Sequence, residues 1–354
     1  MKKIVPILLV ISLTSCSGYS TCEGEGTLET ASSWHECEGR LAFKGYIYEG
    51  GFRFGEAHGY GEFEASRNYS KPLGFVISYK GNFNEGDRDG EGEAVYSRDT
   101  SKSTYTGQWL KNKPHGKGLM TYDPATDTSL IKYEGTLING EPSGFGTYTY
   151  NDGSKYIGEI KEGRLEGQGK MYSKDIIHEG EFKNNVPDGK GVRTQTDKKL
   201  TGIFKGWNLN GQGKIEFASG DVLEGLFKNN RPSGQGSYTI DNGTKISGTF
   251  TTDSANNPIV IGTGNIEYPN GDIFSGFVNE YLERKQGTLE YANGDKYIGS
   301  FKVNDKHGQG TYYFANGDKY VGMFANNKFN GKGSYSANGE VLEGVFKDNV
   351  LESK

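Results

Sequence analysis

Residues 297–319 read YIGSFKVNDKHGQGTYYFANGDK, and the same pattern begins again at Tyr320 as YVGMFANNKFNGKGSYSANGE. A related stretch, FSGFVNEYLERKQGTLEYANGDK, comes directly before it. Each copy has two halves, aromatic-x-Gly-x-aromatic and then Gly-x-Gly followed by alternating residues. Because side chains two residues apart share one face of a strand, Tyr297, Gly299 and Phe301 should lie together. Each copy therefore predicts two β-strands.

Polar segments join these strands. Within a copy, a connector of six residues such as Lys302–His307 links the two halves. Between copies stand Asn-Gly or Asp-Gly pairs, which favour hairpins because such turns need positive φ. These pairs are Asp152-Gly153, Asn242-Gly243, Asn270-Gly271, Asn293-Gly294, Asn316-Gly317 and Asn338-Gly339. The sequence therefore predicts hairpins that follow one another along the chain.

The pattern recurs along the chain, mostly at intervals of 22 or 23 residues. Its copies begin at Tyr48, Tyr79, Tyr105, Tyr133, Tyr156, His178, Leu200, Leu223, Ile246, Phe274, Tyr297, Tyr320 and Leu342. We expect an atypical first unit over residues 22–47, about twelve full repeats over 48–341, and half a repeat over 342–354. Longer intervals mark insertions, which we expect to protrude from the sheet edges, at 64–78, 97–104, 123–132 and 251–261.

Composition favours a thin repeat array over a deep aliphatic core. Gly accounts for 55 of 354 residues, and hydrophobic residues for only 33%. Length alone would suggest two or three domains. A chain rich in Gly, Tyr and Phe without long aliphatic runs instead suits an all-β repeat array. The net charge of −5, with both signs interspersed, argues against a nucleic-acid partner.

The repeats resemble the MORN repeat (membrane occupation and recognition nexus), whose consensus is close to YxGxFxxGxxHGxGxxxxxDG. The resemblance covers residues 22–354, and Trp34–Leu41 resembles the opening unit of bacterial MORN proteins. It implies an all-β fold: an elongated, single-layer array of antiparallel β-hairpins, twisted and grooved along one side. Some copies depart from the pattern, with a non-aromatic first residue at His178, Leu200, Leu223, Ile246 and Leu342, and with Lys285 in place of a Gly.

The Gly-x-Gly motif has a physical interpretation. Glycine weakens a strand, and inside one it usually marks a place where another group packs closely over the backbone. We therefore expect these glycines to make room for aromatic rings that lie flat against the sheet.

The first residues resemble a secretion signal. The apolar segment Ile4–Leu13 follows a basic start and is too short to span a membrane as a helix. Leu13-Thr14-Ser15-Cys16 resembles the lipobox of bacterial lipoproteins. That resemblance implies that residues 1–15 are removed and that Cys16 carries acyl chains, of which two or more make a stable anchor. The alternative is an ordinary cleaved signal peptide with an incidental Cys.

A lipidated Cys16 would place the protein in the cell envelope. Residues 16–21 would form a short tether, with a reach below ~20 Å, so the repeats would sit close to the bilayer. If the cell is Gram-negative, Ser17 after the Cys implies the outer membrane.

Cys22 and Cys37 are the remaining cysteines. In an oxidising envelope compartment, two such cysteines predict a disulfide, here one that would join parts of the first unit. A metal site is the alternative, but His35 is the only further ligand type close by.

Recognisable catalytic and cofactor motifs are missing from the sequence. No Gly-x-Gly fits the dinucleotide fingerprint, no Gly-Lys is followed by Ser or Thr, and no Gly-x-Ser-x-Gly occurs. His58, His115 and His307 share one register, but His58 and His115 lie two repeats apart, about 19 Å across four strands, which is too far to share a metal ion. We therefore predict no catalytic residue, no metal and no cofactor.

The favoured function is that of a membrane-anchored binding or scaffold protein of the cell envelope. Its partners would be the membrane, through the lipid anchor, and one or more proteins, with lipid headgroups as a further ligand. The main alternative is binding of cell-wall or surface glycans, because Tyr, Phe and Trp repeated at fixed intervals could stack on sugar rings. An enzyme of unrecognised type is the third hypothesis.

Overall fold

The computed structural model describes residues 20–24, 26–71, 75–98, 101–123, 130–254, 258–279 and 281–353. In these residues it contains 28 strands and two single-turn helices. The predicted all-β fold is therefore confirmed. The signal segment 1–15 and Cys16 lie outside the described residues, as do parts of all four insertions.

The chain divides into two compact units, residues 1–169 and 170–354. The first unit contains α1 (Leu28–Ala31), α2 (Arg67–Ser70), β1 (Ser20–Thr21), β2 (Cys37–Phe43), β3 (Tyr46–Arg53), β4 (Glu56–Ala65), β5 (Val76–Asn84), β6 (Asp87–Arg98), β7 (Ser101–Leu110), β8 (Lys113–Tyr122), β9 (Leu130–Ile138), β10 (Glu141–Tyr150), β11 (Lys155–Lys161) and β12 (Arg164–Ser173), which continues past the boundary.

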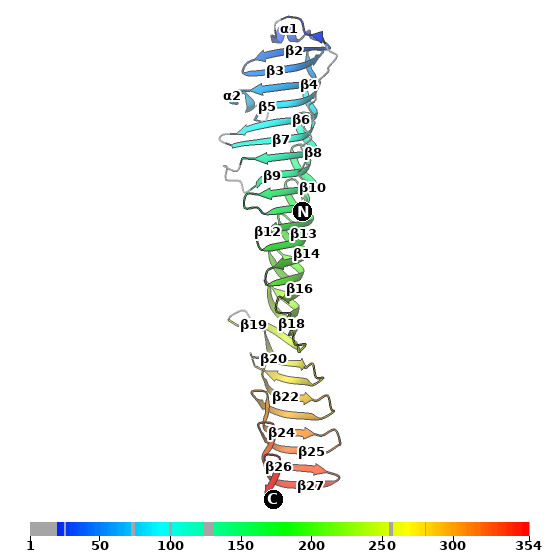
Figure 1. The fold of residues 1–354 in the computed structure, drawn as a ribbon, viewed down its shortest axis with the longest axis vertical. Coiled ribbons are helices and arrows are strands. Elements are labelled where there is room, and N and C mark those ends of the chain that lie inside the picture. Colours follow the sequence, from blue (N-terminus) through cyan, green and yellow to red (C-terminus); the bar gives the residue numbers. More distant parts are fainter. Residues whose placement is uncertain are drawn as a thin grey trace, which may run out of the picture. The chain divides into compact units, whose positions relative to one another are not determined.

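The second unit contains β13 (Ile176–Lys183), β14 (Val186–Gln195), β15 (Lys198–Lys205), β16 (Asn208–Phe217), β17 (Val222–Lys228), β18 (Arg231–Thr239), β19 (Lys245–Thr252), β20 (Pro258–Glu267), β21 (Ile273–Val278), β22 (Arg284–Glu290), β23 (Lys296–Lys302), β24 (Asp305–Tyr313), β25 (Lys319–Ala325), β26 (Lys328–Ala337), β27 (Glu340–Lys347) and β28 (Val350–Ser353). Within each unit, strands that follow one another in sequence lie next to one another (Figure 1).

Consecutive strands pair antiparallel from β2 to β11 and from β13 to β28. The one parallel pair is β1 with β2, among the strands that the structure describes. The expected array of consecutive antiparallel hairpins is therefore confirmed within each unit. Much of the insertions 97–104 and 251–261 belongs to extended strands. Arg98 pairs with Ser101 in the first, and Thr252 pairs with Pro258 in the second.

The connector within a repeat is much shorter than expected. Lys302 pairs with Asp305, so only Val303 and Asn304 form the turn. Both have positive φ, 46° and 67°, as a two-residue type I′ hairpin requires. The prediction of a six-residue connector was therefore wrong, because its other residues belong to the strands.

The turns between repeats are a different type from the one expected for Asn-Gly. At Asn316-Gly317, the Gly317 N–H donates to the Phe314 carbonyl oxygen at 3.0 Å, and only the glycine has positive φ, 95°. This is a three-residue hairpin loop with the glycine in the left-handed region. Asn338-Gly339 alone has positive φ at both residues, among the Asn-Gly and Asp-Gly pairs.

A tyrosine ring lies across a pair of glycines in each regular repeat. In the repeat that starts at Tyr297, Gly299 pairs with Gly310 across the two strands. A Cβ added to either glycine would lie 2.5 Å from atoms of the Tyr297 side chain. The expectation that glycines make room for a flat aromatic ring is therefore confirmed.

The tyrosine hydroxyl also has a fixed hydrogen bond. It donates to the carbonyl oxygen three residues ahead, at 2.6–3.1 Å, in the repeats that begin with Tyr48, Tyr79, Tyr105, Tyr133, Tyr156, Tyr297 and Tyr320. Such a bond contributes about 1 kcal/mol. The ring is thus held over the glycines by its far end as well as by packing.

Only two of the three glycines in the aromatic-x-Gly-x-aromatic and Gly-x-Gly motifs of a repeat serve this purpose. The first glycine of Gly-x-Gly, such as Gly308, has no ring above it and instead has positive φ, 71°. The pairing of the two strands shifts register around Gly308: Gly299 pairs with Gly310, but Phe301 pairs with Lys306. This glycine therefore permits a β-bulge, a role that the sequence interpretation missed.

The second aromatic residue of each repeat packs against the tyrosine of the repeat before it. Phe324 meets the ring of Tyr297 edge-on at 4.9 Å, and Trp109 meets Tyr79 at 5.1 Å. Edge-to-face pairs of this kind contribute about 0.5–1.5 kcal/mol each beyond their buried area. The core of each unit is therefore a column along one face of the sheet, which we call the ring column. Aromatic rings form most of it, and Leu, Ile and Val replace some rings, as at Leu200, Leu223 and Ile246 in the second unit.

We expect Gly310→Ala to destabilise the second unit by about 1–3 kcal/mol, because the new methyl group overlaps the Tyr297 ring. The loss is measured by urea unfolding and by hydrogen exchange of β23–β25. Combining it with Tyr297→Leu should recover part of the loss, since Leu200 and Leu223 occupy this register elsewhere. Thr311→Ala, on the opposite face, is the control. If the losses in the free energy of unfolding caused by Gly310→Ala and Tyr297→Leu simply add in the double variant, the proposed packing is contradicted.

Candidate functional site

A largely apolar hollow in the first unit, which we call the N-terminal groove, has a volume of about 730 Å³. Its floor is formed by Tyr48, Phe52 and Phe83, all of which are buried members of the ring column. This volume lies within the range of small-molecule binding sites, which are usually concave, largely apolar and supplied with a few polar groups.

The two ends of the N-terminal groove differ in character. One end lies at the type I′ turns and carries the four charged residues of the lining, Glu56, Arg88, Lys111 and Lys113. The other end lies toward the opposite ends of the strands and is lined by Leu41, Tyr46, Phe63, Val76 and Tyr96. The groove is therefore amphipathic along the strand direction, with a net positive end.

Arg88 is the charged group closest to the core. Only 8% of it is exposed, and its guanidinium carbon lies 4.8 Å from the Trp109 ring centroid and 5.8 Å from that of Tyr79. Nε donates to Asn112 Oδ1 at 3.2 Å, and Nη2 donates to the Asn112 carbonyl oxygen at 3.1 Å. Nη1 is buried and has no hydrogen-bond partner among the described residues.

Burial lowers the pKa of Arg88, yet an arginine side chain stays protonated in proteins. The groove therefore contains a buried positive charge with one nitrogen, Nη1, that has no hydrogen-bond partner among the described residues. A buried polar group that lacks a partner costs free energy, and more so when it is charged.

Sequence analysis did not single out Arg88, although a signal was present. It pairs with Phe83, and the residues at the same register of other repeats are mostly apolar: Ala57, Pro114, Pro142, Pro187, Leu209, Pro232 and Phe329. Arg284 and Lys306 are the charged residues at this register in the second unit. A comparison of the residues at this position in all repeats would have singled out Arg88, Arg284 and Lys306.

Arg284 and Lys306 lie in a smaller hollow of about 310 Å³, in which positive and negative charges are more evenly matched. Lys306 donates to the Tyr291 hydroxyl at 2.9 Å, and Arg284 Nη2 donates to the Asn304 carbonyl oxygen. Asp272 and Asp305 line the same hollow. Two carboxylates thus offset the two cations, which leaves less need for a bound anion.

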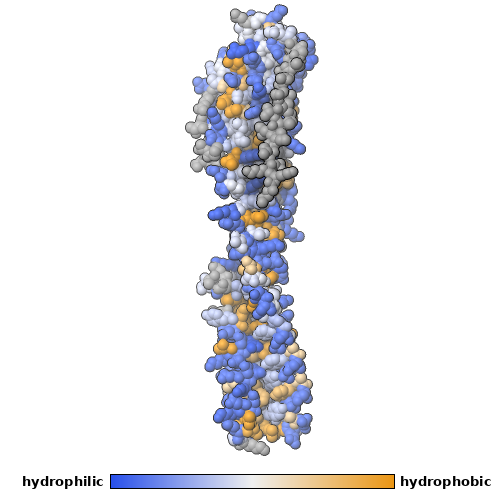
Figure 2. All heavy atoms as spheres, viewed as in Figure 1, coloured by the Kyte–Doolittle hydropathy of each residue, from blue (hydrophilic) through white to orange (hydrophobic). Residues whose placement is uncertain are grey.

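A second surface feature lies on the other face of the second unit. The residue between the Gly and the second core residue of each first strand points away from the ring column. It is apolar and exposed at five of the eight such positions in the second unit: Ile203, Leu226, Phe277, Met323 and Val345. We call these five residues the outer stripe. Glu181, Thr249 and Ser300 stand at the other three positions. Figure 2 shows apolar residues at the surface in patches between hydrophilic ones.

The same register is polar in the first unit. Asn82, Gln108 and Glu159 stand there, and all are exposed. Gln212 and Gln309 are the cross-strand partners of Leu226 and Met323 within the stripe. Gln286 is the partner of Phe277, and Lys190 and Lys332 are the partners of Ile203 and Val345. Apolar side chains next to glutamines and lysines at this register are therefore specific to the second unit.

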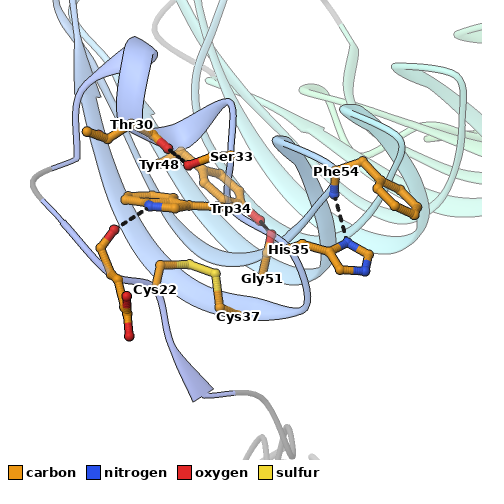
Figure 3. The surroundings of a disulfide bond; sticks show 10 residues. Cys22, Thr30, Ser33, Trp34, His35, Cys37, Tyr48, Gly51 and Phe54 are labelled. Atoms are coloured by element: carbon orange, nitrogen blue, oxygen red, sulfur yellow. Dashed lines mark hydrogen bonds between the residues drawn. A yellow bond between two sulfur atoms is a disulfide. The ribbon is translucent and has the colours of Figure 1, made fainter.

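Cys22 and Cys37 are joined by a disulfide in the first unit, with a Cα–Cα distance of 4.9 Å. Figure 3 shows Trp34 above this bond, and the Trp34 indole N–H donates to the Glu23 carbonyl oxygen at 2.8 Å. Trp34 also meets Phe52 edge-on at 4.7 Å. The disulfide therefore lies beneath the ring that begins the aromatic column.

The remaining predicted residues fall into two groups. Cys16 lies outside the described residues. His58, His115 and His307 occupy equivalent positions in different repeats, and the Nδ1 atom of each is buried without a partner. No cluster of three or more His, Cys, Asp or Glu suited to a metal ion occurs in the part of the chain that the structure describes.

The glycan alternative depended on exposed aromatic residues at fixed intervals. The first aromatic residue of the repeat is instead buried: Tyr105, Tyr133, Tyr156, Tyr297 and Tyr320 are 0% exposed. The most exposed rings, at Phe54 and Tyr281, occupy different positions in their repeats. The rings that recur at fixed spacing are therefore not available to stack on a sugar.

Family comparison now identifies the repeats. The MORN repeat model matches ten segments: 48–66, 79–100, 105–124, 133–155, 156–175, 178–198, 207–222, 224–245, 297–319 and 320–341. The chain belongs to the MORN repeat family. The model skips the copies that begin at Ile246 and Phe274, yet the MORN glycine pairing persists there, as Gly248 with Gly264 and Gly276 with Gly287.

Among curated proteins, the chain is similar to alsin from human, mouse and rat. The identity is 30% over 91 residues, which is 25% of this chain and 6% of each alsin. The chain therefore matches only a small part of these relatives. Within the described MORN array, no helix has the length and apolar character needed to cross a membrane.

His178 is a further departure from the MORN pattern. It stands where other repeats have tyrosine, is 0% exposed, and pairs across the strands with Arg193, which is 5% exposed. Burial, and then the charge of Arg193, lowers the pKa of His178 to about 4. Phe182, Phe204 and Trp207 are the rings around it.

We expect the stability of the second unit to fall as the pH drops from about 6.5 to 4. The unfolded chain takes up a proton at His178 in that pH range, whereas the folded chain does not. For a pKa shift of this size, the free energy of unfolding should fall by up to about 3 kcal/mol. His178→Tyr should remove this loss in urea unfolding measured across the range, and His115→Gln should retain it. An unchanged pH dependence in His178→Tyr would contradict the assignment.

Proposed function

We propose that this MORN-repeat protein is a scaffold of the cell envelope, anchored to the membrane through lipid on Cys16, that binds a protein partner through the outer stripe. The observation that carries the proposal is the row of exposed apolar residues at one register of the second unit. The MORN repeat family is a family of non-catalytic scaffolds that typically bind membranes or proteins, which agrees with this role.

The chemistry of the outer stripe favours a protein over an anionic lipid headgroup. A headgroup site would gather Lys and Arg, whereas Leu226 and Met323 are uncharged and are flanked by glutamines. Apolar side chains with amides between them suit a protein surface, which offers both apolar contacts and hydrogen-bond partners. Single exposed apolar residues are common on proteins, but an aligned row of them is typical of an interaction site.

The glycan alternative has less support than the protein partner. The recurrent tyrosines hold the sheet together from inside the ring column. An enzymatic role also lacks support, because neither surface brings together a nucleophile and a base.

The anchor is tested with Cys16→Ser. We expect the wild-type protein to incorporate radiolabelled palmitate and to sediment with membranes, and the variant to do neither, because the only proposed acylation site is gone. Cys22→Ser, which removes a cysteine outside the lipobox-like segment, is the control and should still be labelled. Persistent labelling of Cys16→Ser would contradict the anchor.

The outer stripe is tested by photo-crosslinking in the native envelope. A photoreactive amino acid at Leu226 should crosslink a protein, whereas the same group at Gln108, the equivalent register of the first unit, should not. The captured protein is identified by mass spectrometry and purified. We expect it to bind the Leu226→Gln/Met323→Gln variant at least about tenfold more weakly than wild type, because the loss of two apolar contacts should cost more than 1.4 kcal/mol. Equal binding would refute the stripe as the contact surface.

A further inference from the structure

The N-terminal groove is not needed for a protein scaffold, and its construction points to a ligand of its own. It lies in the first unit, whereas the outer stripe lies in the second unit, on the face turned away from that unit's own ring column. Its positive end and apolar end are separated along the strands, so a ligand that fills it should be amphipathic in the same direction. This inference goes beyond the proposed scaffold function and does not depend on it.

We propose that the N-terminal groove binds a long-chain carboxylic acid, with the carboxylate at Arg88 and the hydrocarbon chain along the aromatic floor. Arg88 is already oriented by Asn112, which accepts from Nε and supplies its carbonyl oxygen to Nη2. The remaining donor, Nη1, is buried without a partner. A carboxylate oxygen that accepts from Nη1 gives this nitrogen a hydrogen-bond partner and pairs the charge of the guanidinium.

The charges around the groove suit one negative charge. Lys111 and Lys113 are exposed at the same end and add to the positive potential, while Glu56 opposes them. The net charge of the lining is therefore positive by two. Nη1 of Arg88 can donate to a carboxylate oxygen, and one carboxylate is enough to pair the single charge of the guanidinium.

The apolar part of the groove suits a hydrocarbon chain better than a peptide. The groove extends along β4 from Ala57 to Phe63, about 20 Å at ~3.4 Å per residue. One acyl chain spans about half of a ~30 Å bilayer core, or about 15 Å, and so fits that length. Backbone groups of the floor strands are already paired in the sheet, so a peptide chain would lose hydration there without replacement. A hydrocarbon chain has no such groups to satisfy.

Palmitate binding to the full-length chain with Cys16→Ser tests the proposal, since this substitution removes the acyl chains that would require detergent. Titration calorimetry should show saturable binding. 1-Hexadecanol, which has the same chain without a carboxylate, should bind at least about tenfold more weakly, because hydrogen bonds to charged groups contribute about 1.5–3 kcal/mol. No palmitate binding, or equal binding of the alcohol, would overturn the proposal.

Arg88→Leu identifies the residue responsible. Leu209 occupies this register in the second unit, so leucine is compatible with the fold. The variant should lose at least about tenfold in palmitate affinity and keep the affinity for 1-hexadecanol. Arg284→Leu is the matched control, because Arg284 makes the same contact to a turn carbonyl in the second unit, and it should bind palmitate as the parent does. Unchanged palmitate affinity in Arg88→Leu, or an equal loss in Arg284→Leu, would refute the assignment.

A measurement on the unsubstituted groove remains decisive if Arg88→Leu fails to fold. Palmitate labelled with ¹³C at the carboxyl carbon reports its own titration by NMR. Bound at Arg88, the carboxyl group should titrate at lower pH than the same acid in phosphatidylcholine vesicles, because the guanidinium stabilises the ionised form. Titration at the same or a higher pH would place the carboxyl group away from Arg88 and overturn the proposal.

Discussion

The packing of one tyrosine ring across a pair of glycines is the contact on which each regular repeat depends. Because the Tyr297 ring occupies the space where side chains of Gly299 and Gly310 would stand, both strands need glycine at the same level. The contact therefore fixes the register within the repeat. That register then places Phe301 on the ring column, in edge-on contact with Phe274 of the preceding repeat at 5.5 Å. Pairing within a repeat and stacking between repeats thus follow from one requirement.

This requirement explains why the fold could be predicted from sequence. Tyrosine, glycine and phenylalanine recur at spacing two, and no other short element needs that combination. The turns were harder to predict. A valine at positive φ, such as Val303, is unusual in isolation. The neighbouring repeat supplies what the local sequence does not show: Asn304 Oδ1 accepts from the Arg284 backbone N–H at 2.8 Å, and Asn327 Oδ1 accepts from that of Lys306.

Arg88 shows a different limit of sequence analysis. As one arginine among many charged residues it carries no signal, and its meaning appears only when strand pairing aligns it with Pro114, Pro142 and other apolar residues. The structure adds what no alignment of registers could, namely that Asn112 uses two of the guanidinium nitrogens and leaves the third buried. The position of Arg88 could therefore have been predicted from the sequence, but its hydrogen bonding and burial could not.

The same constraint that makes the repeats alike also determines where they can differ. A side chain at Gly299 or Gly310 would overlap the Tyr297 ring, so these two positions cannot encode a preference for one partner without damaging the sheet. The second residue of the second strand and the outward residue of the first strand are free of that requirement. The first unit places a charge at the former, Arg88, and the second unit places apolar side chains at the latter, such as Met323. Because those two registers lie on opposite faces, one repeat architecture can present a ligand groove and a protein contact surface without either interfering with the ring column.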